Sequence, residues 1–220
     1  MRLVTLPGVF RPISDTWLLA DALGHEPLGP SARVLDLCSG SGALAISAAL
    51  SGRDVTAVDV SRRAVLTIRL NAALNRVRVR ALRGDLFGAV AGEQFDAIVS
   101  NPPYVPSPAG EVPRRGRARA WDAGRDGRAL LDRICARARA HLRPGGALLV
   151  VHSSLLGLDP TVDALRAGGL AVDVATRERG PLGPLMAGRR AHLEAAGMLA
   201  QGQREEDVVV IRARNAPCVR

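Results

Sequence analysis

The stretch Arg33-Val34-Leu35-Asp36-Leu37-Cys38-Ser39-Gly40-Ser41-Gly42 decides the fold of this 220-residue chain. Its first half, residues 33–37, is a short apolar run and predicts a buried β-strand. Its second half is a turn rich in glycine and serine, and the apolar residues 43–50 that follow predict a helix. A strand that passes through a glycine turn into a helix is typical of α/β proteins with a parallel sheet.

The alternation of strand and helix continues toward the end of the chain. A helix is predicted after Ser61, which is placed to cap it, and runs to about Ala73; a second helix is predicted at residues 126–142, ending at Pro144-Gly145-Gly146. Further strands are predicted at residues 54–60, 77–82, 95–100, 147–152, 170–176 and 208–212. The sequence therefore predicts an α/β fold with a seven-stranded, mostly parallel sheet and helices on both faces. Because no long helix clearly separates the last two strands, we expect the last strand to be antiparallel.

Length and composition indicate one domain. Of the 220 residues, 47% are apolar and 23% are charged, which argues against a disordered chain. We expect residues 1–220 to form a single domain, with residues 1–30 as an N-terminal extension and the loop at residues 105–125 as a mobile substrate loop. No apolar run reaches the ~18 residues that span a bilayer, and no signal-peptide pattern opens the chain. A cytoplasmic protein without a membrane segment is therefore expected.

Charge and cysteine content are less specific. The formal net charge is +9, and all thirty basic residues are arginines. This charge fits an anionic partner such as RNA, since net charge reports on association rather than on fold. It also fits a GC-rich genome, which favours arginine codons. Cys38, Cys135 and Cys218 are far apart and the four histidines are scattered, which argues against a disulfide framework and against a metal site.

The glycine turn carries the first chemical signal. Gly40 and Gly42 let the backbone pass close to a ligand, but the spacing lacks the third glycine of the dinucleotide-binding pattern GxGxxG. Asp36 comes at the end of the strand before the turn, where a carboxylate would repel a pyrophosphate and attract a cation. A ligand with an ammonium and a sulfonium fits this pattern better than NAD does, so the predicted cofactor is S-adenosyl-L-methionine.

Two more acids follow strands at the same predicted edge of the sheet. Asp59 ends the second strand, where such folds place a carboxylate on ribose hydroxyls, and Val60 comes next. Asp85 follows the third strand, where it can accept a hydrogen bond from an adenine amino group while Leu86 contacts the ring. Each acid taken alone also fits a solvated loop residue or a helix cap. The three together favour a binding site.

The segment Asn101-Pro102-Pro103-Tyr104 directly follows the predicted strand at residues 95–100. Two consecutive prolines fix the backbone and remove two N–H donors, so hydrogen-bond acceptors predominate. The Asn101 side-chain oxygen and the Pro102 carbonyl can both accept from one planar NH2 group, and Tyr104 can stack on the face of an amide or a base. A rigid turn without a ligand is the alternative interpretation.

Taken in order, these motifs resemble the class I S-adenosylmethionine-dependent methyltransferases. More narrowly, they are similar to the HemK-type family, which methylates a glutamine side chain in peptide-chain release factors. The resemblance covers about residues 8–212 and includes Phe10-Arg11-Pro12, Asp15-Thr16, residues 121–127 and Glu205-Glu206-Asp207. It implies a seven-stranded Rossmann-like methyltransferase fold. About thirty residues precede the first strand, as in the family's short form without an N-terminal helical domain.

The resemblance also implies roles for individual residues. Asn101, Pro102 and Tyr104 would be catalytic. The residues that would bind the cofactor are Thr16, Asp36, Cys38, Gly40, Gly42, Asp59, Val60, Asp85, Leu86 and Asn101. Because an amide nitrogen is a poor nucleophile, the two acceptors would orient its lone pair and stabilise the developing charge. We assign no general base, since a lone histidine such as His152 at a strand end is more often a core residue.

Partners and alternative functions follow from the same resemblance. The predicted substrate is a release factor, and the short form suggests an activating partner subunit. The arginine-rich segment from Arg114 to Arg119 is a solvated loop by default, or a basic lid that contacts ribosome or RNA. Methylation of an exocyclic amine of adenine or guanine in nucleic acid stays open, as does methylation of a small molecule. A binding module without activity is disfavoured because Asp36, Asp59 and the NPPY segment are all present.

Overall fold

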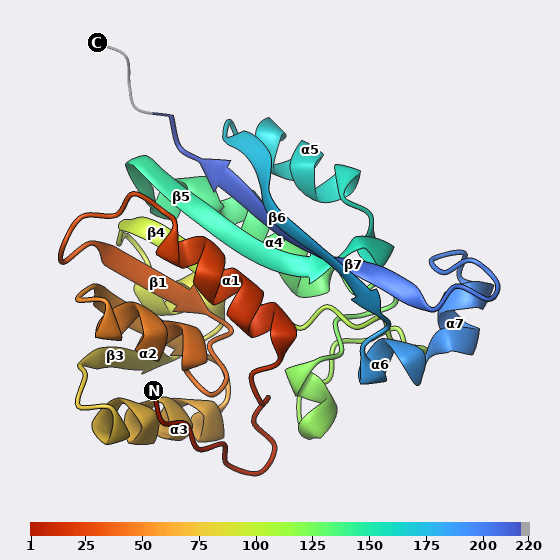
Figure 1. The fold of residues 1–220 in the computed structure, drawn as a ribbon, viewed down its shortest axis with the longest axis horizontal. Coiled ribbons are helices and arrows are strands. Elements are labelled where there is room, and N and C mark those ends of the chain that lie inside the picture. Colours follow the sequence, from red (N-terminus) through yellow and green to blue (C-terminus); the bar gives the residue numbers. More distant parts are fainter. Residues whose placement is uncertain (217–220) are drawn as a thin grey trace.

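The computed structural model describes residues 1–216 and contains a seven-stranded sheet between two layers of helices (Figure 1). The strands are β1 Arg33–Leu37, β2 Asp54–Asp59, β3 Val79–Arg83, β4 Phe95–Ser100, β5 Leu142–Ser153, β6 Ala171–Pro181 and β7 Glu205–Arg214. Their order in the sheet is β3-β2-β1-β4-β5-β7-β6, and β7 is antiparallel to both of its neighbours. The predicted fold class and the antiparallel last strand are therefore confirmed. Cys218 lies outside the described residues.

Helices cover both faces of the sheet. The main ones are α1 Ser14–Gly24, α2 Ala43–Leu50, α3 Arg62–Leu74, α4 Ala129–Arg137 and α5 Asp159–Ala167. α1, α2 and α3 pack on one face, and α4 and α5 pack on the other (Figure 1). Side chains alternate along each strand, so Val34 joins the apolar cluster under α1 to α3, while Leu35 joins the cluster under α4 and α5. In the part of the chain that the structure describes, no helix has the length and apolar character needed to cross a membrane.

Part of the predicted N-terminal extension is a helix of the covering layer. α1 lies against α2 and β5, and its residues Leu19 and Leu23 are buried in the same cluster as Val34. The N-cap position of α1 is Ile13, whose side chain cannot accept a hydrogen bond from the first turn. The sequence therefore lacks a capping side chain at that position, and tertiary packing adds to the bond of the Ile13 N–H to Thr16 Oγ1 in stabilising α1.

The helix predicted at residues 126–142 is shorter in the structure. α4 ends at Arg137, a 3₁₀ turn follows, and β5 begins at Leu142. The Pro144-Gly145-Gly146 segment, predicted to stop a helix, lies inside β5 at a bulge where the pairing of β4 with β5 shifts register. Glycine is favoured at position 146 because a Cβ there would lie 3.0 Å from the Phe95 carbonyl oxygen, closer than an ordinary contact.

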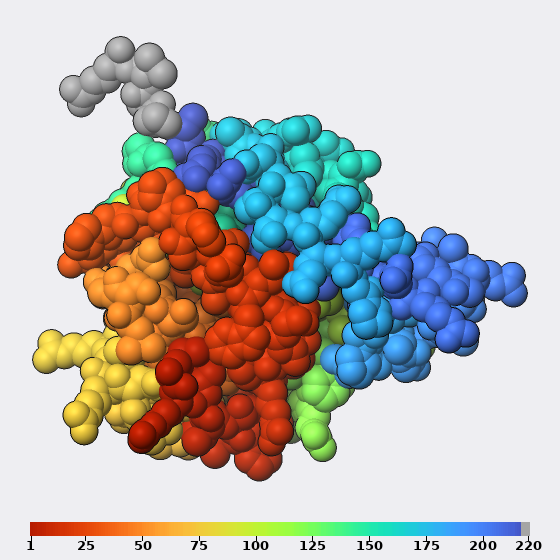
Figure 2. All heavy atoms as spheres, viewed as in Figure 1, coloured from red at the N-terminus to blue at the C-terminus, as the bar shows by residue number. Residues whose placement is uncertain are grey.

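The C-terminal part of the sheet reaches further than predicted. α5 separates β5 from β6, and β6 and β7 are both longer than the predicted strands. The chain between β6 and β7 forms α6 (Pro184–Ala187) and α7 (Arg190–Ala195). This insertion, residues 182–204, projects from the body of the molecule (Figures 1 and 2). Its own apolar residues Leu182, Met186, Leu193 and Leu199 are buried.

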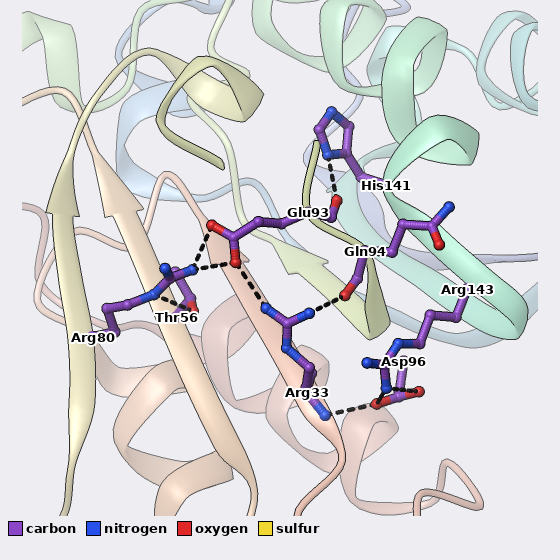
Figure 3. Close-up of polar contacts among 8 residues, drawn as sticks. All are labelled: Arg33, Thr56, Arg80, Glu93, Gln94, Asp96, His141 and Arg143. Carbon is purple, nitrogen blue, oxygen red and sulfur yellow. Dashed lines mark hydrogen bonds and ion pairs between the residues drawn. The ribbon is translucent and has the colours of Figure 1, made fainter. Parts of the chain in front are cut away.

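Ion pairs join the strands at their amino ends (Figure 3). Glu93 accepts hydrogen bonds from Arg80 and Arg33, each at 2.7 Å, and these bonds hold the pKa of the Glu93 carboxyl below its usual value. Asp96 accepts from the Arg33 backbone N–H at 2.8 Å and from the Arg143 side chain at 3.0 Å. Because these groups are partly exposed, the network fixes the arrangement of the strands more than it adds stability.

Candidate active site

A cavity of about 730 Å³ lies at the carboxyl ends of β1, β2 and β4. Open α/β sheets bind ligands at this edge, and the volume is typical of a site for a small molecule. Most of its lining residues come from the segments 8–16, 38–44, 58–61, 84–86, 101–105, 112–121 and 181–186. Most of the site residues that the sequence predicts were expected at this same edge of the sheet.

The glycine turn forms one wall of the cavity. Gly40 has a φ of +56° and its N–H donates to Asp59 Oδ2 at 2.9 Å. Gly42 also has a positive φ, +81°, and a Cβ there would lie 3.0 Å from Ile68 Cγ1 of α3. Gly40 lines the cavity, whereas Gly42 does not. The second glycine therefore lets α2 begin close to α3 rather than leaving room for a ligand.

Asp36 is fully buried beneath the glycine turn and does not line the cavity. Its Oδ2 accepts from the Ser39 hydroxyl at 2.5 Å and from the Ala45 N–H at 3.2 Å, while its Oδ1 has no hydrogen-bond partner. Burial raises the pKa of this carboxyl to about 7. The structure thus puts Asp36 beneath the start of α2, in the role of a cap, and outside the cavity wall.

Asp59 lies in the cavity wall at the last position of β2. Its two carboxyl oxygens accept from the backbone N–H groups of Gly40 at 2.9 Å and Ser61 at 2.8 Å. Burial raises the pKa of Asp59, and these hydrogen bonds together with the charge of Arg119 oppose the rise. Each oxygen keeps a lone pair that a hydroxyl in the cavity can use.

Four further predicted residues also line the cavity: Cys38, Val60, Asp85 and Leu86. The Asp85 carboxylate pairs with Arg133 at 2.7 Å. Leu86 has a φ of +48° at the start of a 3₁₀ turn, and its side chain is buried. Burial, reinforced by the nearby carboxylates of Asp59 and Asp36, raises the pKa of the Cys38 thiol, so this thiol is neutral at physiological pH.

The NPPY segment lies in the cavity wall with Asn101, Pro102, Pro103 and Tyr104 all among its lining residues. The preceding Ser100 hydroxyl donates to the Leu37 carbonyl at 2.9 Å and so joins the segment to β1. Asn101 Nδ2 donates to Thr16 Oγ1 at 3.3 Å. This bond engages the nitrogen end of the Asn101 amide and leaves the oxygen end as an acceptor.

The Tyr104 hydroxyl donates to Asp15 Oδ2 at the first turn of α1. Burial raises the pKa of Tyr104 well above its ordinary value, and the neighbouring Asp15 charge raises it further. Tyr104 is therefore a neutral phenol whose hydroxyl is already bonded within the protein. Asp15 was not predicted as a site residue, although the sequence motif Asp15-Thr16 contains the signal that would have identified it.

Glu206 is a second buried acid that the predictions missed. It accepts from the Ser153 hydroxyl and, through Oε1, from the Gly183 N–H at 2.8 Å. Burial raises the pKa of its carboxyl. Gly183 lines the cavity at the start of the insertion between β6 and β7. Glu206 therefore fixes the wall that this insertion supplies. The resemblance includes Glu206 in the motif Glu205-Glu206-Asp207, but nothing in the sequence indicates its contact with Gly183.

The loop at residues 105–125 closes another side of the cavity. The Val105 N–H donates to the Trp121 carbonyl at 2.8 Å, which closes the base of the loop. Arg114 and Arg119 line the cavity. Arg189 of the insertion donates to Asp122 Oδ1 at 2.5 Å and so connects the loop to the insertion. The mobility of this loop stays a prediction.

Comparison with known proteins adds independent evidence. The model of the methyltransferase small domain family matches residues 1–112. A Methanocaldococcus jannaschii protein named "Putative protein N5-glutamine methyltransferase" is 33% identical over 187 residues, covering 84% of this chain and 93% of that protein. A release factor glutamine methyltransferase of Bordetella pertussis is 41% identical over 155 residues, covering 66% of this chain. The chain spans only 57% of that bacterial relative.

Solved structures agree on the fold. A methyltransferase of E. cuniculi matches with a TM-score of 0.64 at 21% identity, over 95% of this chain and 99% of that chain. It was solved in complex with a partner protein, and the complex is described as responsible for methylation of the eRF1 translation termination factor. The 16S rRNA N2 guanosine methyltransferase RsmC of T. thermophilus, solved with AdoMet and guanosine, matches with a TM-score of 0.59 at 26% identity over 96% of this chain and 46% of that chain.

The resemblance to glutamine methyltransferases that the motifs indicate is thus confirmed by relatives found over most of the chain. With a family match over half its length and an archaeal relative covered almost from end to end, this chain belongs to the methyltransferase small domain family and is a methyltransferase.

Proposed function

We propose that this methyltransferase transfers a methyl group from S-adenosyl-L-methionine to the side-chain amide nitrogen of a glutamine in a translation release factor. The observation that carries the proposal is the orientation of Asn101 in the cavity wall, with its amide nitrogen bonded to Thr16 and its oxygen left to accept. The names of the relatives in M. jannaschii and B. pertussis support a glutamine as the methyl acceptor.

The chemistry of the cavity wall fits the cofactor. Asp59 offers carboxylate oxygens to a ribose diol, and Gly40 lies beside it without a side chain. Asp85 and Leu86 offer an acceptor and an apolar surface to adenine. A cation bound in this region would favour the ionised form of buried Asp36, whereas an anion would raise the pKa of that carboxyl further. When bound, the cofactor supplies a methyl group activated on a sulfonium.

The acceptor side relies on Asn101 and Pro102. A side-chain amide NH2 has two hydrogens, and two fixed acceptors can hold both of them. Amide resonance weakens when the nitrogen gains positive character, and the same two oxygens then stabilise the charge that develops. Because both oxygens are fixed by a stiff, proline-containing segment, little reorganisation is needed as the charge appears. The nitrogen loses its proton after transfer, so the residues need not remove it beforehand.

The test is a labelling experiment with the purified chain and S-adenosylmethionine carrying an isotopically labelled methyl group. Separate reactions contain release factors, a peptide with a Gly-Gly-Gln sequence, the matched Gly-Gly-Asn peptide, ribosomes, tRNA and DNA. We expect the label on the glutamine of the release factor and of the first peptide, with none on the asparagine peptide. Labelling should be slower by ~10²-fold or more when Asn101→Ala replaces the wild type. Mass spectrometry locates the methylated residue. Label in nucleic acid alone would overturn the proposal.

A nucleic-acid amine is the second candidate function. The likeness to a methyltransferase solved with guanosine favours it, as do Arg114 and Arg119 at the cavity, because arginines can contact a phosphate backbone. This function predicts label in ribosomal RNA or tRNA and a rate that falls steeply with salt. We further propose that the arginine-rich loop contacts ribosome or RNA, which is tested by adding salt to the release-factor reaction. We also propose an activating subunit, which is tested by adding a cell extract to the same reaction.

A further inference from the structure

Two adjacent residues of α1 bind the NPPY segment. Thr16 Oγ1 accepts from Asn101 Nδ2 at 3.3 Å, and Asp15 Oδ2 accepts from the Tyr104 hydroxyl. These contacts join residues 85 and 89 positions apart in the chain. Asp15 and Thr16 are only 5% and 6% exposed, so water competes little for these bonds. The first turn of α1 is thus the structural support of the proposed acceptor site.

The bonds of Thr16 determine which end of the Asn101 amide faces the cavity. Besides Asn101, the Ile13 N–H donates to Thr16 Oγ1 at 3.4 Å. A hydroxyl oxygen has two lone pairs, and these two N–H groups use both of them. In this arrangement the Thr16 hydroxyl therefore acts as an acceptor toward Asn101. An Asn101 amide turned by 180° could bond to Thr16 only if the hydroxyl rotated to donate its proton to the amide oxygen.

We infer that Thr16 is a positioning residue, which holds the Asn101 side chain with its nitrogen toward α1 and so presents its oxygen to the substrate nitrogen. The inference rests on the proposed function, since a methyl-accepting NH2 group needs an acceptor and an inverted Asn101 amide would offer it a donor. It also gives Thr16 a different task from the cofactor contact predicted for it. α1 is rigid enough for this task because Leu19 and Leu23 anchor it in the core.

The orientation of Asn101 can be measured without any substrate. The chain has four asparagines, Asn71, Asn75, Asn101 and Asn215. Selective ¹⁵N labelling of asparagine therefore gives four side-chain NH2 signals, and the signal lost in Asn101→Ala belongs to Asn101. We expect Thr16→Val to shift this signal and to speed its hydrogen exchange, while Thr16→Ser, which keeps the hydroxyl, restores both. Thr67→Val is the matched control, because Thr67 is a buried threonine on α3 that donates to the Arg63 carbonyl and does not line the cavity.

Kinetics of methyl transfer give the second readout. We expect Thr16→Val to lower kcat by about 10- to 100-fold, the cost of a misplaced catalytic group, while Thr16→Ser and Thr67→Val retain wild-type turnover within about two-fold. The dissociation constant of S-adenosylmethionine, measured by calorimetry, should stay within about two-fold in all of them. Thermal unfolding of each variant sets an assay temperature at which it is folded.

Three results would overturn the inference: an unchanged Asn101 signal in Thr16→Val, unchanged kcat, or a loss confined to cofactor affinity. Failure of the proposed function is distinct, since it would appear as a wild-type chain that labels no glutamine. In that case the NMR comparison still decides whether Thr16 orients Asn101, and kcat is compared on whichever acceptor the wild type methylates.

Discussion

Replacing Asp36 with asparagine should change how stability depends on pH. The buried carboxyl has a pKa of about 7, against an ordinary value of 3.8. A difference of this size corresponds to about 4 kcal/mol between the two protonation states. Asparagine can keep both hydrogen bonds through its oxygen, and its NH2 group takes the place of the unpartnered Oδ1. The variant therefore mimics the neutral carboxyl at every pH.

The sign of the effect follows from the raised pKa. Below pH ~3.8 the group is protonated in both the folded and the unfolded chain, so it costs nothing. As pH rises toward 7 the unfolded chain releases the proton while the folded chain keeps it, and the free energy of unfolding falls. Above pH 7 the full cost is present. Asp36→Asn removes that cost, so its advantage over the wild type should grow from near zero at pH 4 to about 4 kcal/mol at pH 8.

Urea unfolding followed by circular dichroism from pH 4 to pH 8 measures this difference. The comparison uses variant minus wild type, because other groups impose their own pH dependence on both proteins. Asp54→Asn serves as the control, since it makes the same substitution at an exposed acid at the opposite end of β2. Parallel curves for Asp36→Asn and the wild type would show that Asp36 is not protonated in the folded chain, and the reasoning from its burial would fail.

Three further predictions concern the site and the core. Asn101→Ala should lower turnover by ~10²-fold or more with little change in cofactor affinity; initial rates with near-normal turnover would contradict this. Asp59→Ala should weaken the binding of S-adenosylmethionine by roughly 1.5–3 kcal/mol through loss of charge-assisted hydrogen bonds, and calorimetry measures it. His152 is buried with an unpartnered Nε2, and burial lowers its pKa to about 4 from 6.5. Stability should therefore be lost as pH falls from 6.5 to 4, and urea unfolding of His152→Phe should show that this loss, about 3 kcal/mol, is gone.

The sequence was sufficient to predict most of the sheet. β1, α2 and β4 have the predicted bounds, because each is a short apolar segment closed by a clear turn signal. The elements that were missed or misplaced either lack such a signal or use it for another purpose. α1 follows an uncapped Ile13, and Pro144-Gly145-Gly146 is used for a bulge in a strand instead of for the end of a helix. In both cases tertiary packing overrode the local preference of the residues.

Many residues of the candidate site could be predicted from the sequence, but their contacts could not. Asn101, Tyr104 and Asp59 were recognised from their position after strands, and all three line the cavity. The hydrogen bonds of Tyr104 to Asp15 and of Asn101 to Thr16 span more than 80 residues, and no local pattern in the chain announces them. Glu206 and the insertion that it holds are missing from the predictions for the same reason.

The register of the strands explains why two similar acids have different roles. Asp36 and Asp59 both come at strand ends before a turn, and the sequence gives no reason to separate them. In the sheet, however, Asp36 is paired with Ala57 on one side and Val99 on the other. Asp59 and Asn101 each lie two residues beyond those partners, about 6–7 Å further toward the carboxyl edge. Asp36 is therefore covered by the start of α2 and bonds to Ala45, while Asp59 and Asn101 reach the cavity. An offset of two residues between neighbouring strands decides which polar side chain lines the cavity and which one caps a helix.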